Sequence, residues 1–332
     1  MERGLILAFS AVILWGLLDA ASRYAVVVIG ADPWIFSCVN LMVGAVVMLL
    51  LAGRGQGKMN TLYHTHTWVF GFFRVLMTLF LVFAFTTLSA SEVNFMLRLN
   101  VIMGMAAGYF IFKRRPQKTD VPGLVLLVGG YITLVLRQED AFLNVAVLLV
   151  IAAAVCDTIL TVIAESHPVS NRASGIHARL RYTGFVLLVT SLFFVAMALL
   201  LAYLKTLPFF GGAAGSLNIV IEKAPSLESF THSGTWVAGG LIGVLLRAPS
   251  MYLYLYAARL LKTENLMMAA TLAPFATLGA EGVFVASGLM QAPTLDTFDI
   301  AAGFTMTTGA LLMVFLRAHA QRRRVNTREK DL

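Results

Sequence analysis

Seven ionisable side chains lie inside long apolar stretches of this sequence. They are Asp19, Arg23, Arg74, Arg98, Asp157, Arg247 and Glu281. On insertion scales a charged side chain at the centre of a membrane helix costs about 2.5–3.5 kcal/mol, so each charge needs a reason to be there. Arginine binds carboxylates and phosphates through paired hydrogen bonds, and a carboxylate within a membrane can relay protons. The pattern predicts either a site for a charged solute or ion pairs that fix helix packing.

Arg247 and Asp157 are the deepest of these charges. At 1.5 Å per residue they lie about 18 and 21 Å along their apolar stretches. Pro249 follows Arg247 and frees backbone carbonyls, and Pro274 interrupts the next stretch seven residues before Glu281. Proline-broken membrane segments are the best sequence indication of a binding site. We therefore expect Arg247 to bind substrate and the two acids and two prolines to act in coupling or gating. The alternative is an ion pair of Arg247 with an acid.

Structural and functional roles stay open for the other intramembrane charges. Asp19 and Arg23 share a helix face at a spacing of four residues, so they can neutralise each other, and Asp19 is also a candidate for coupling. Arg74 and Arg98 lie about 10 Å from the nearer helix ends, within snorkelling reach, and are candidates for substrate binding. Asn94 is four residues before Arg98, and this polar pair is expected to face the bundle interior.

Two aromatic residues are further candidates for substrate binding. Trp15 lies in the middle of an apolar stretch, where its indole N–H either bonds across helices or lines a cavity. Tyr252 lies about a turn from Arg247 and shares a helix face with Tyr256. Stacking on a substrate and simple helix packing both fit Tyr252.

The composition places these residues in a membrane protein. Hydrophobic residues make up 59% of the 332 residues and charged residues 13%, and the mean hydropathy is +0.82. Soluble domains have about 45–50% hydrophobic residues and about 25% charged residues. The composition therefore excludes a water-soluble enzyme, a disordered tail and a fibrous repeat. One crossing takes about 20 residues. Apolar stretches bounded by charge, proline or glycine predict an all-α fold with ten transmembrane helices near 4–29, 33–52, 68–87, 91–112, 121–137, 144–165, 180–204, 235–258, 264–288 and 297–317.

The basic residues are distributed unequally between the two ends of these spans. Of the 25 Lys and Arg residues, four lie within spans and three, Arg137, Lys205 and Lys223, follow odd-numbered spans. The other 18 fall on the opposite side, which predicts cytoplasmic N- and C-termini. This topology accounts for the net charge of +8 without a nucleic-acid partner. Cys38, Cys156 and six scattered histidines predict no metal site, no disulfide and no cofactor.

The two halves of the chain carry an internal repeat. A shift of 172 residues pairs Gly71 with Gly243, Leu88 with Leu260, and Ser91-Glu92 with Thr263-Glu264. Five spans per half is an odd number, so the halves insert in opposite orientations, as in transporters that bind substrate between inverted repeats. We expect one repeat over 1–140, a second over 141–320 and a basic cytoplasmic tail over 321–332. Residues 205–234 are expected to form an extracytoplasmic loop with a short surface helix around 216–223.

Short motifs in both halves resemble the EamA-type branch of the drug/metabolite transporter superfamily. They are Leu14-Trp15-Gly16, Asp32-Pro33, Thr87-Leu-Ser-Ala-Ser-Glu92, and Lys262-Thr-Glu264 running to Pro274. The resemblance implies two inverted five-helix repeats in which helices 1–4 and 6–9 surround a central cavity and helices 5 and 10 are peripheral. The sequence departs from the family pattern at Ile102, Asn40, Lys113-Arg-Arg-Pro116 and the insertion at 205–234, while Arg181 fits the pattern of the second half.

These observations together predict a secondary transporter rather than an enzyme. The substrate is expected to be a small anionic or zwitterionic metabolite, such as an amino acid or organic acid, moved by alternating access. No phosphate-binding Gly-rich loop occurs, so proton coupling or exchange would supply the energy. A bacterial inner membrane is the expected location, and a homodimer stays open. The alternatives are a membrane organiser that has kept the fold and a membrane-embedded lipid-modifying enzyme, for which the scattered histidines offer little support.

Overall fold

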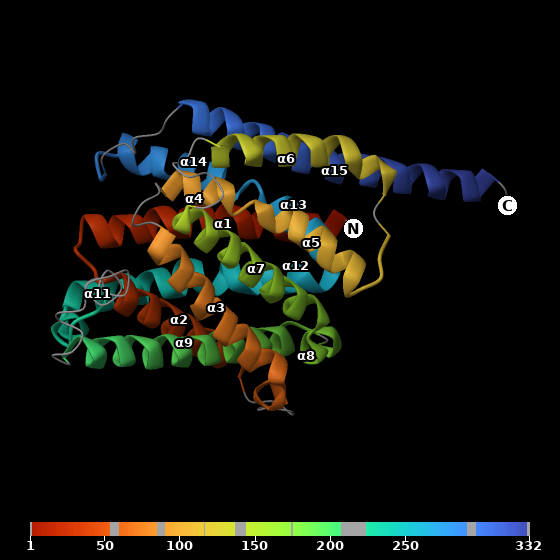
Figure 1. Cartoon of the computed structure of the whole chain (residues 1–332). Helices are drawn as coiled ribbons and strands as arrows, with labels where there is room; N and C mark the ends of the chain where they lie inside the picture. The colour runs from red at the N-terminus through yellow and green to blue at the C-terminus, as the bar shows by residue number, and fades with distance from the viewer. Residues whose placement is uncertain are drawn as a thin grey trace.

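The computed structural model describes residues 2–53, 60–84, 90–115, 117–136, 144–173, 175–206, 224–290 and 297–330. All regular elements in these ranges are helices (Figure 1). In chain order they are α1 (Glu2–Val27), α2 (Pro33–Ala52), η1 (Asn60–Tyr63), α3 (Thr65–Ala84), α4 (Ala90–Met96), α5 (Leu99–Phe110), η2 (Lys118–Asp120), α6 (Val121–Leu136), α7 (Val145–Ser166), α8 (Pro168–Arg172), α9 (Ile176–Thr206), η4 (Glu228–Thr231), α11 (Ser233–Ile242), η5 (Gly243–Arg247), α12 (Ala248–Leu260), α13 (Thr263–Ala270), α14 (Ala273–Ala286) and α15 (Thr297–Lys330).

The helices have the length and composition of a polytopic membrane protein. Nine stretches of the described chain are long and apolar enough to cross a membrane, and the shorter apolar helix Thr65–Leu81 brings the number to ten. The predicted all-α polytopic fold is therefore confirmed. The predicted surface helix around 216–223 lies outside the described residues, as do Arg54, Lys58, Arg137 and Lys223.

The start of α2 explains why one predicted boundary is exact. Asp32 caps the helix, because its Oδ1 accepts hydrogen bonds from the backbone N–H groups of Trp34 (2.9 Å) and Ile35 (3.1 Å). Pro33 occupies the first turn, where its missing N–H costs nothing. Local chemistry alone therefore fixes this helix end.

Two predicted single spans are each broken in the middle. The stretch 91–112 is divided into α4 and α5 at Leu97–Arg98, and 264–288 is divided into α13 and α14 at Thr271–Leu272. The breaks fall 174 residues apart, at equivalent places in the two halves. Broken membrane helices expose backbone carbonyls, which are tolerated where protein or a cavity surrounds them. Both breaks must therefore lie inside the bundle.

The repeat is visible in atomic detail where α3 and α11 begin. Residues 67–71 read Thr-Trp-Val-Phe-Gly and residues 235–239 read Thr-Trp-Val-Ala-Gly, at an offset of 168 residues. In each copy the indole N–H donates to the carbonyl six residues earlier, at 2.8 Å for Trp68 and 2.7 Å for Trp236. The two helix starts lie at opposite ends of the bundle (Figure 1), as an inverted repeat requires.

The offset between the halves increases within the second of these helices. Gly71 packs against α9, while Gly239 and the predicted counterpart Gly243 both pack against α2, so at the motif offset of 168 residues Gly239 is the counterpart of Gly71. From the tryptophan to the arginine there are six residues up to Arg74 but eleven up to Arg247. The second half contains the π-helical turn η5 at this point. A π turn holds more residues than an α turn, so it takes up part of the extra length.

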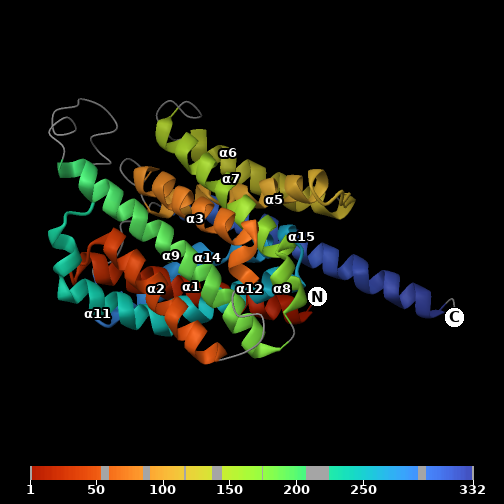
Figure 2. The ribbon, with the colours of Figure 1, turned by 90° about the horizontal axis from the view of Figure 1, so that it is seen from below.

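Most of the described basic residues outside the spans gather at one end of the bundle. Arg181 Nη2 donates to the carbonyl of Gly53 (3.1 Å), and Arg259 Nη1 donates to the carbonyl of Ala173 (2.5 Å). We call this end the basic end and define it by the described residues of 60–67, 113–120, 165–182 and 259–265. The N-terminus lies there, and the last turns of α15 project beyond it (Figure 2).

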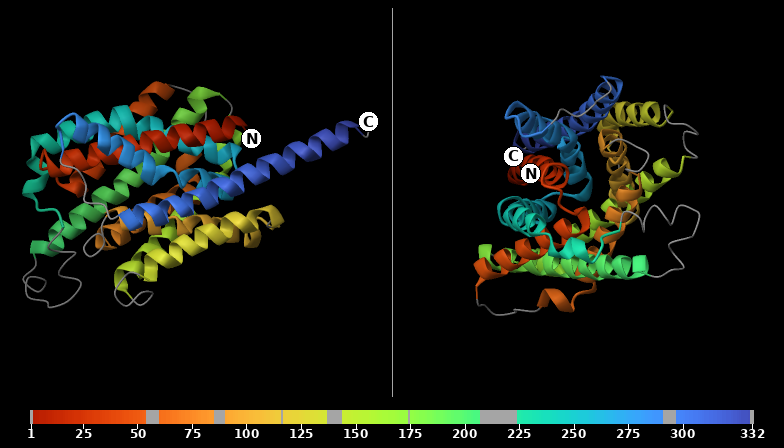
Figure 3. Two further views of the ribbon diagram at one scale, coloured as in Figure 1. Left: turned by 90° about the horizontal axis from the view of Figure 1, so that it is seen from above. Right: turned by 90° about the vertical axis from the view of Figure 1, so that its left-hand side faces the viewer.

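Helices α6 and α15 pack on each other at the edge of the bundle, as the resemblance implied for helices 5 and 10 (Figure 3). Their backbones approach closely at a pair of glycines. A Cβ atom on Gly123 would lie 2.2 Å from the carbonyl oxygen of Gly309, and one on Gly309 would lie 2.5 Å from that of Gly123. Small residues allow this approach between membrane helices.

Adding one methyl group to this contact is expected to destabilise the fold. Gly123→Ala forces two backbones apart, and overpacking of this kind costs about 1–3 kcal/mol. Gly129→Ala is the matched control, because a Cβ on this glycine of α6 meets no atom within 4 Å. Thermal unfolding of both variants in detergent would measure the difference. Equal melting temperatures would show that the glycine pair is not needed for packing.

Candidate functional site

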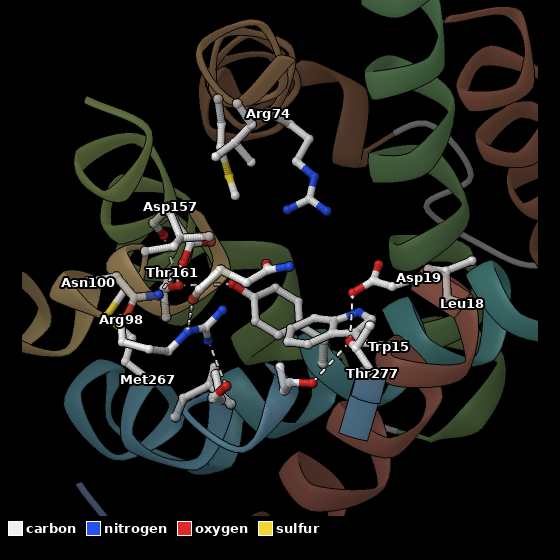
Figure 4. Close-up of a pocket in the computed structure, with 18 of the residues that line it drawn as sticks. Trp15, Leu18, Asp19, Arg74, Arg98, Asn100, Asp157, Thr161, Met267 and Thr277 are labelled. Atoms are coloured by element: carbon white, nitrogen blue, oxygen red, sulfur yellow. Dashed lines mark hydrogen bonds between the residues drawn. The ribbon is translucent and has the colours of Figure 1, made fainter. Parts of the chain in front are cut away.

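A central cavity of about 210 Å³ brings together charged side chains from distant parts of the chain (Figure 4). Seven of the residues predicted from the sequence line it: Trp15, Asp19, Arg74, Asn94, Arg98, Asp157 and Arg247. They come from α1, α3, α4, the break before α5, α7 and η5. Four further polar residues, Asn100, Thr161, Tyr254 and Thr277, line it without having been predicted.

Arg98 joins the two broken helices. It lies at the break between α4 and α5 and is only 5% exposed. Its Nε donates to the carbonyl of Asn94 (2.9 Å), and its Nη1 donates to the carbonyl of Ala270 (2.7 Å) at the end of α13. The guanidinium therefore satisfies carbonyls that the breaks leave without helical partners. Arg98 holds the site together and also contributes positive charge to the cavity.

Asp157 is held by an amide from the opposite half of the chain. Asn100 Nδ2 donates to Asp157 Oδ2 at 2.6 Å, and Asn100 Oδ1 is a buried acceptor without a partner among the described residues. Thr161 hydrogen-bonds to the Tyr254 hydroxyl (3.0 Å), one helical turn beyond Asp157. This part of the wall thus offers one carboxylate and one unused amide oxygen.

Arg74 differs from the other two arginines of the cavity. Its guanidinium reaches into open space from α3, and Asp19 points toward the same space from α1 (Figure 4). Among the described residues Arg74 has no side-chain hydrogen bond and no ion pair. Asp19 Oδ2 accepts a hydrogen bond from Thr277 (3.3 Å). The cavity therefore contains an unpaired positive charge opposite a carboxylate.

Arg247 lies on the π turn η5, lines the cavity and contacts α2. Its Nε donates to Asn40 Oδ1 at 3.1 Å, and Asn40 is 1% exposed. Pro249 follows in the first turn of α12. The helix interruption predicted from Pro249 is thus present as a π turn.

Several predicted partners and positions differ from the structure. Arg23 pairs with Glu281 at 2.8 Å instead of with Asp19, because α14 packs beside α1. That pair lies outside the cavity lining. Tyr252 packs on Tyr256 with ring centroids 6.2 Å apart, also outside the cavity lining. Pro274 lies in the first turn of α14 and does not line the cavity either.

Tyr254 takes the position expected of Tyr252. Two residues turn a helix by about 200°, so Tyr254 faces away from the Tyr252 and Tyr256 side chains. Its ring lies 5.1 Å from that of Trp15, and both line the cavity. The predicted contact of Trp15 with a cavity is therefore present, with an aromatic neighbour from the other half of the chain.

A cluster of ion pairs joins the two halves at the basic end. Arg114, after α5, forms ion pairs with Glu165 at the end of α7 and with Glu264 in α13, the latter at 3.0 Å. Glu165 Oε2 also accepts hydrogen bonds from the backbone N–H (2.7 Å) and hydroxyl (2.5 Å) of Thr263. We call Arg114, Glu165, Thr263 and Glu264 the ionic cluster. From the sequence, Thr263-Glu264 is part of the internal repeat and of the motif that carries the family resemblance, and no ion pair is predicted there.

The ionic cluster continues toward the peripheral helices. Arg317 of α15 forms a buried ion pair with Asp120 (2.7 Å) and donates to Asn265 Oδ1 (2.9 Å). Burial lowers the pKa of Arg114, but its hydrogen bond to Glu165 and the charges of Glu165 and Glu264 outweigh burial and raise that pKa overall. Arg114 therefore stays charged and pairs with both carboxylates.

Comparison with known proteins gives the fold and a family similarity of the first half of the chain. A comparison with curated proteins finds no match. Among solved structures 28 chains match. One, described as "Crystal structure of protein", is 17% identical with a TM-score of 0.62, over 95% of this chain and 98% of that chain. At that identity the likeness shows the fold alone. The sequence pattern described as the EamA-like transporter family matches residues 2–137, which are the first five-helix half. Residues 2–137 are thus similar to the EamA-like transporter family, which fits a membrane transporter of the drug/metabolite type.

Proposed function

We propose that the protein is a secondary transporter that carries a small anionic or zwitterionic organic metabolite through the central cavity. The unpaired guanidinium of Arg74 is the observation that carries this proposal. A charge inside the membrane region is costly unless it is paired, so the site lacks an anion. A substrate carboxylate or phosphate supplies that anion through paired hydrogen bonds.

The charge balance of the cavity favours this class of substrate. Its ionisable lining residues are three arginines, Arg74, Arg98 and Arg247, and two acids, Asp19 and Asp157. The surplus is one positive charge, which an anion neutralises. Asp19 lies across the open space from Arg74, so a zwitterion can place its carboxylate on Arg74 and its ammonium group on Asp19. A volume of about 210 Å³ suits a solute smaller than a drug molecule, whose pockets are about 300–1,000 Å³.

The ionic cluster supports alternating access as the transport mechanism. It ties α5 of the first half to α7 and α13 of the second half at the basic end. In inverted-repeat transporters one half moves against the other around a fixed midplane site. Opening the basic end must separate these ions, so the cluster stabilises the state in which that end is closed. By the distribution of Lys and Arg we place the basic end in the cytoplasm.

Asp157 is the residue we assign to proton coupling. Asp157→Asn is expected to abolish uptake driven by a pH gradient while leaving exchange of substrate largely intact, because the amide keeps the contact with Asn100 but cannot release a proton. Uptake and counterflow in proteoliposomes measure the two activities. Glu228→Gln is the control, because Glu228 is an exposed acid of η4 that lines neither cavity. Unchanged proton-driven uptake by Asp157→Asn would remove the coupling role and leave the binding site standing.

A ligand screen tests the transport proposal itself. Purified protein is heated with amino acids, organic acids, nucleosides or phosphorylated sugars, and a bound substrate raises the melting temperature by mass action. Each stabilising compound is then tested for counterflow in proteoliposomes. We expect at least one anionic or zwitterionic compound to pass both tests. Stabilisation only by neutral or cationic compounds would contradict the proposed substrate class.

A further inference from the structure

A second cavity, of about 220 Å³, lies at the basic end and shares no lining residue with the central cavity. It is formed by η1, α8 and the start of α9. Its polar lining residues are Asn60, Thr61, His64, Arg172, Arg181 and Tyr182. It is as large as the central cavity, yet the proposed transport mechanism does not use it.

The lining of this second cavity is basic. It contains two arginines and one histidine, and none of its described lining residues is acidic. Arg172 is exposed in the last turn of α8, and among the described residues its guanidinium forms no hydrogen bond or ion pair. Arg181 is anchored, since its Nη2 donates to the carbonyl of Gly53 (3.1 Å) beyond the end of α2. One fixed and one available guanidinium therefore face the same space.

Buried hydrogen bonds behind the cavity hold its walls in place. His167, 1% exposed, accepts a hydrogen bond at Nδ1 from the backbone N–H of Val169 (3.2 Å). Its Nε2 therefore carries the proton and donates to the Thr67 hydroxyl (3.0 Å). That hydroxyl donates to the carbonyl of Thr61 (2.7 Å). The chain of bonds ties α8, which carries Arg172, to η1, which ends one residue before His64.

We propose that the second cavity is an anion site that binds a phosphate group. Arginine guanidinium groups match the geometry of phosphate oxygens, and basic pockets between membrane helices at the cytoplasmic side bind lipid head groups. The phosphate belongs either to an anionic phospholipid or to a soluble phosphate compound. The site does not depend on the transport proposal, because it rests on other residues at another level of the bundle.

Delipidated protein in neutral detergent tests the site by thermal unfolding. The probes are inorganic phosphate and mixed micelles that contain phosphatidylglycerol, with phosphatidylcholine micelles and sodium chloride as controls. We expect one of the phosphate probes to raise the melting temperature of the wild type. Arg172→Gln is expected to weaken this effect at least about tenfold in apparent Kd, and His64→Gln is expected to weaken it too.

Arg115→Gln is the matched control, since Arg115 is an exposed arginine of the same end that lines neither cavity. Stabilisation by phosphatidylglycerol alone identifies a lipid head group, and stabilisation by inorganic phosphate identifies a soluble phosphate. Native mass spectrometry counts bound lipid independently of stability. The proposal is overturned if neither probe binds, or if Arg172→Gln and Arg115→Gln weaken binding equally.

Discussion

Arg74→Ala is expected to abolish measurable substrate binding and transport while leaving the fold as stable as before. Arg74 forms no side-chain hydrogen bond or ion pair within the described chain, so its loss removes neither. A bound anion would lose its paired hydrogen bonds, and truncating one partner of a buried charged pair costs about 2–5 kcal/mol. The lower bound corresponds to roughly a 30-fold loss of affinity.

Two measurements separate a binding role of Arg74 from a structural one. The melting temperature without ligand should change little, because the variant loses both the repulsion between Arg74 and Arg247 and the attraction between Arg74 and Asp19. The shift caused by the ligand should disappear. Arg74→Lys keeps the charge but not the planar fork, so it should recover only part of the affinity. Wild-type uptake by Arg74→Ala would place the substrate elsewhere in the protein.

Arg114→Gln is expected to open the basic end of the cavity. The change leaves Glu165 and Glu264 as neighbouring carboxylates without their shared cation. A state in which α5 and α13 separate is then favoured. We expect roughly a tenfold shift in the population, which corresponds to about 1.4 kcal/mol. Transport should fall because the closed state is depleted.

Cysteine labelling measures this opening. In a background with Cys38 and Cys156 replaced by alanine, Met267→Cys places one thiol on the cavity wall. A membrane-impermeant reagent added at the basic end should label it roughly ten times faster in Arg114→Gln than in Arg115→Gln. Equal labelling rates in the two variants would count against a gating role of the ionic cluster.

Much of the fold can be read from local sequence, because each helix is long, apolar and bounded by its own signals. The span predicted at 33–52 is observed as Pro33–Ala52 because Asp32 and Pro33 define its start. The break before Leu99 has no such signal, since no proline lies near it. It depends on Arg98, whose partner carbonyl at Ala270 is 172 residues away. Only the folded chain brings these two groups together.

The candidate site, too, could be predicted in part from local sequence and in part not. Charge within apolar stretches was enough to select Asp19, Arg74, Arg98, Asp157 and Arg247, all of which line the cavity. The partners in ion pairs could not be predicted from the spacing of charged residues along one helix. A side chain on an adjacent helix can lie closer than a side chain on the next turn of the same helix. Arg23 thus pairs with Glu281, 258 residues away, and not with the carboxylate four residues before it.

The additional residues between Trp236 and Arg247 change the depth at which the Arg247 guanidinium lies in the bundle. Helices α3 and α11 begin at opposite ends of the bundle. If the two copies had the same length, each arginine would lie at the same distance from the end at which its own helix begins. Six residues put Arg74 about 9 Å beyond Trp68, but eleven put Arg247 about 16 Å beyond Trp236. The longer second copy therefore brings its guanidinium toward the level of the first. The unequal lengths of the two copies thus bring the two guanidinium groups toward the same depth of the bundle.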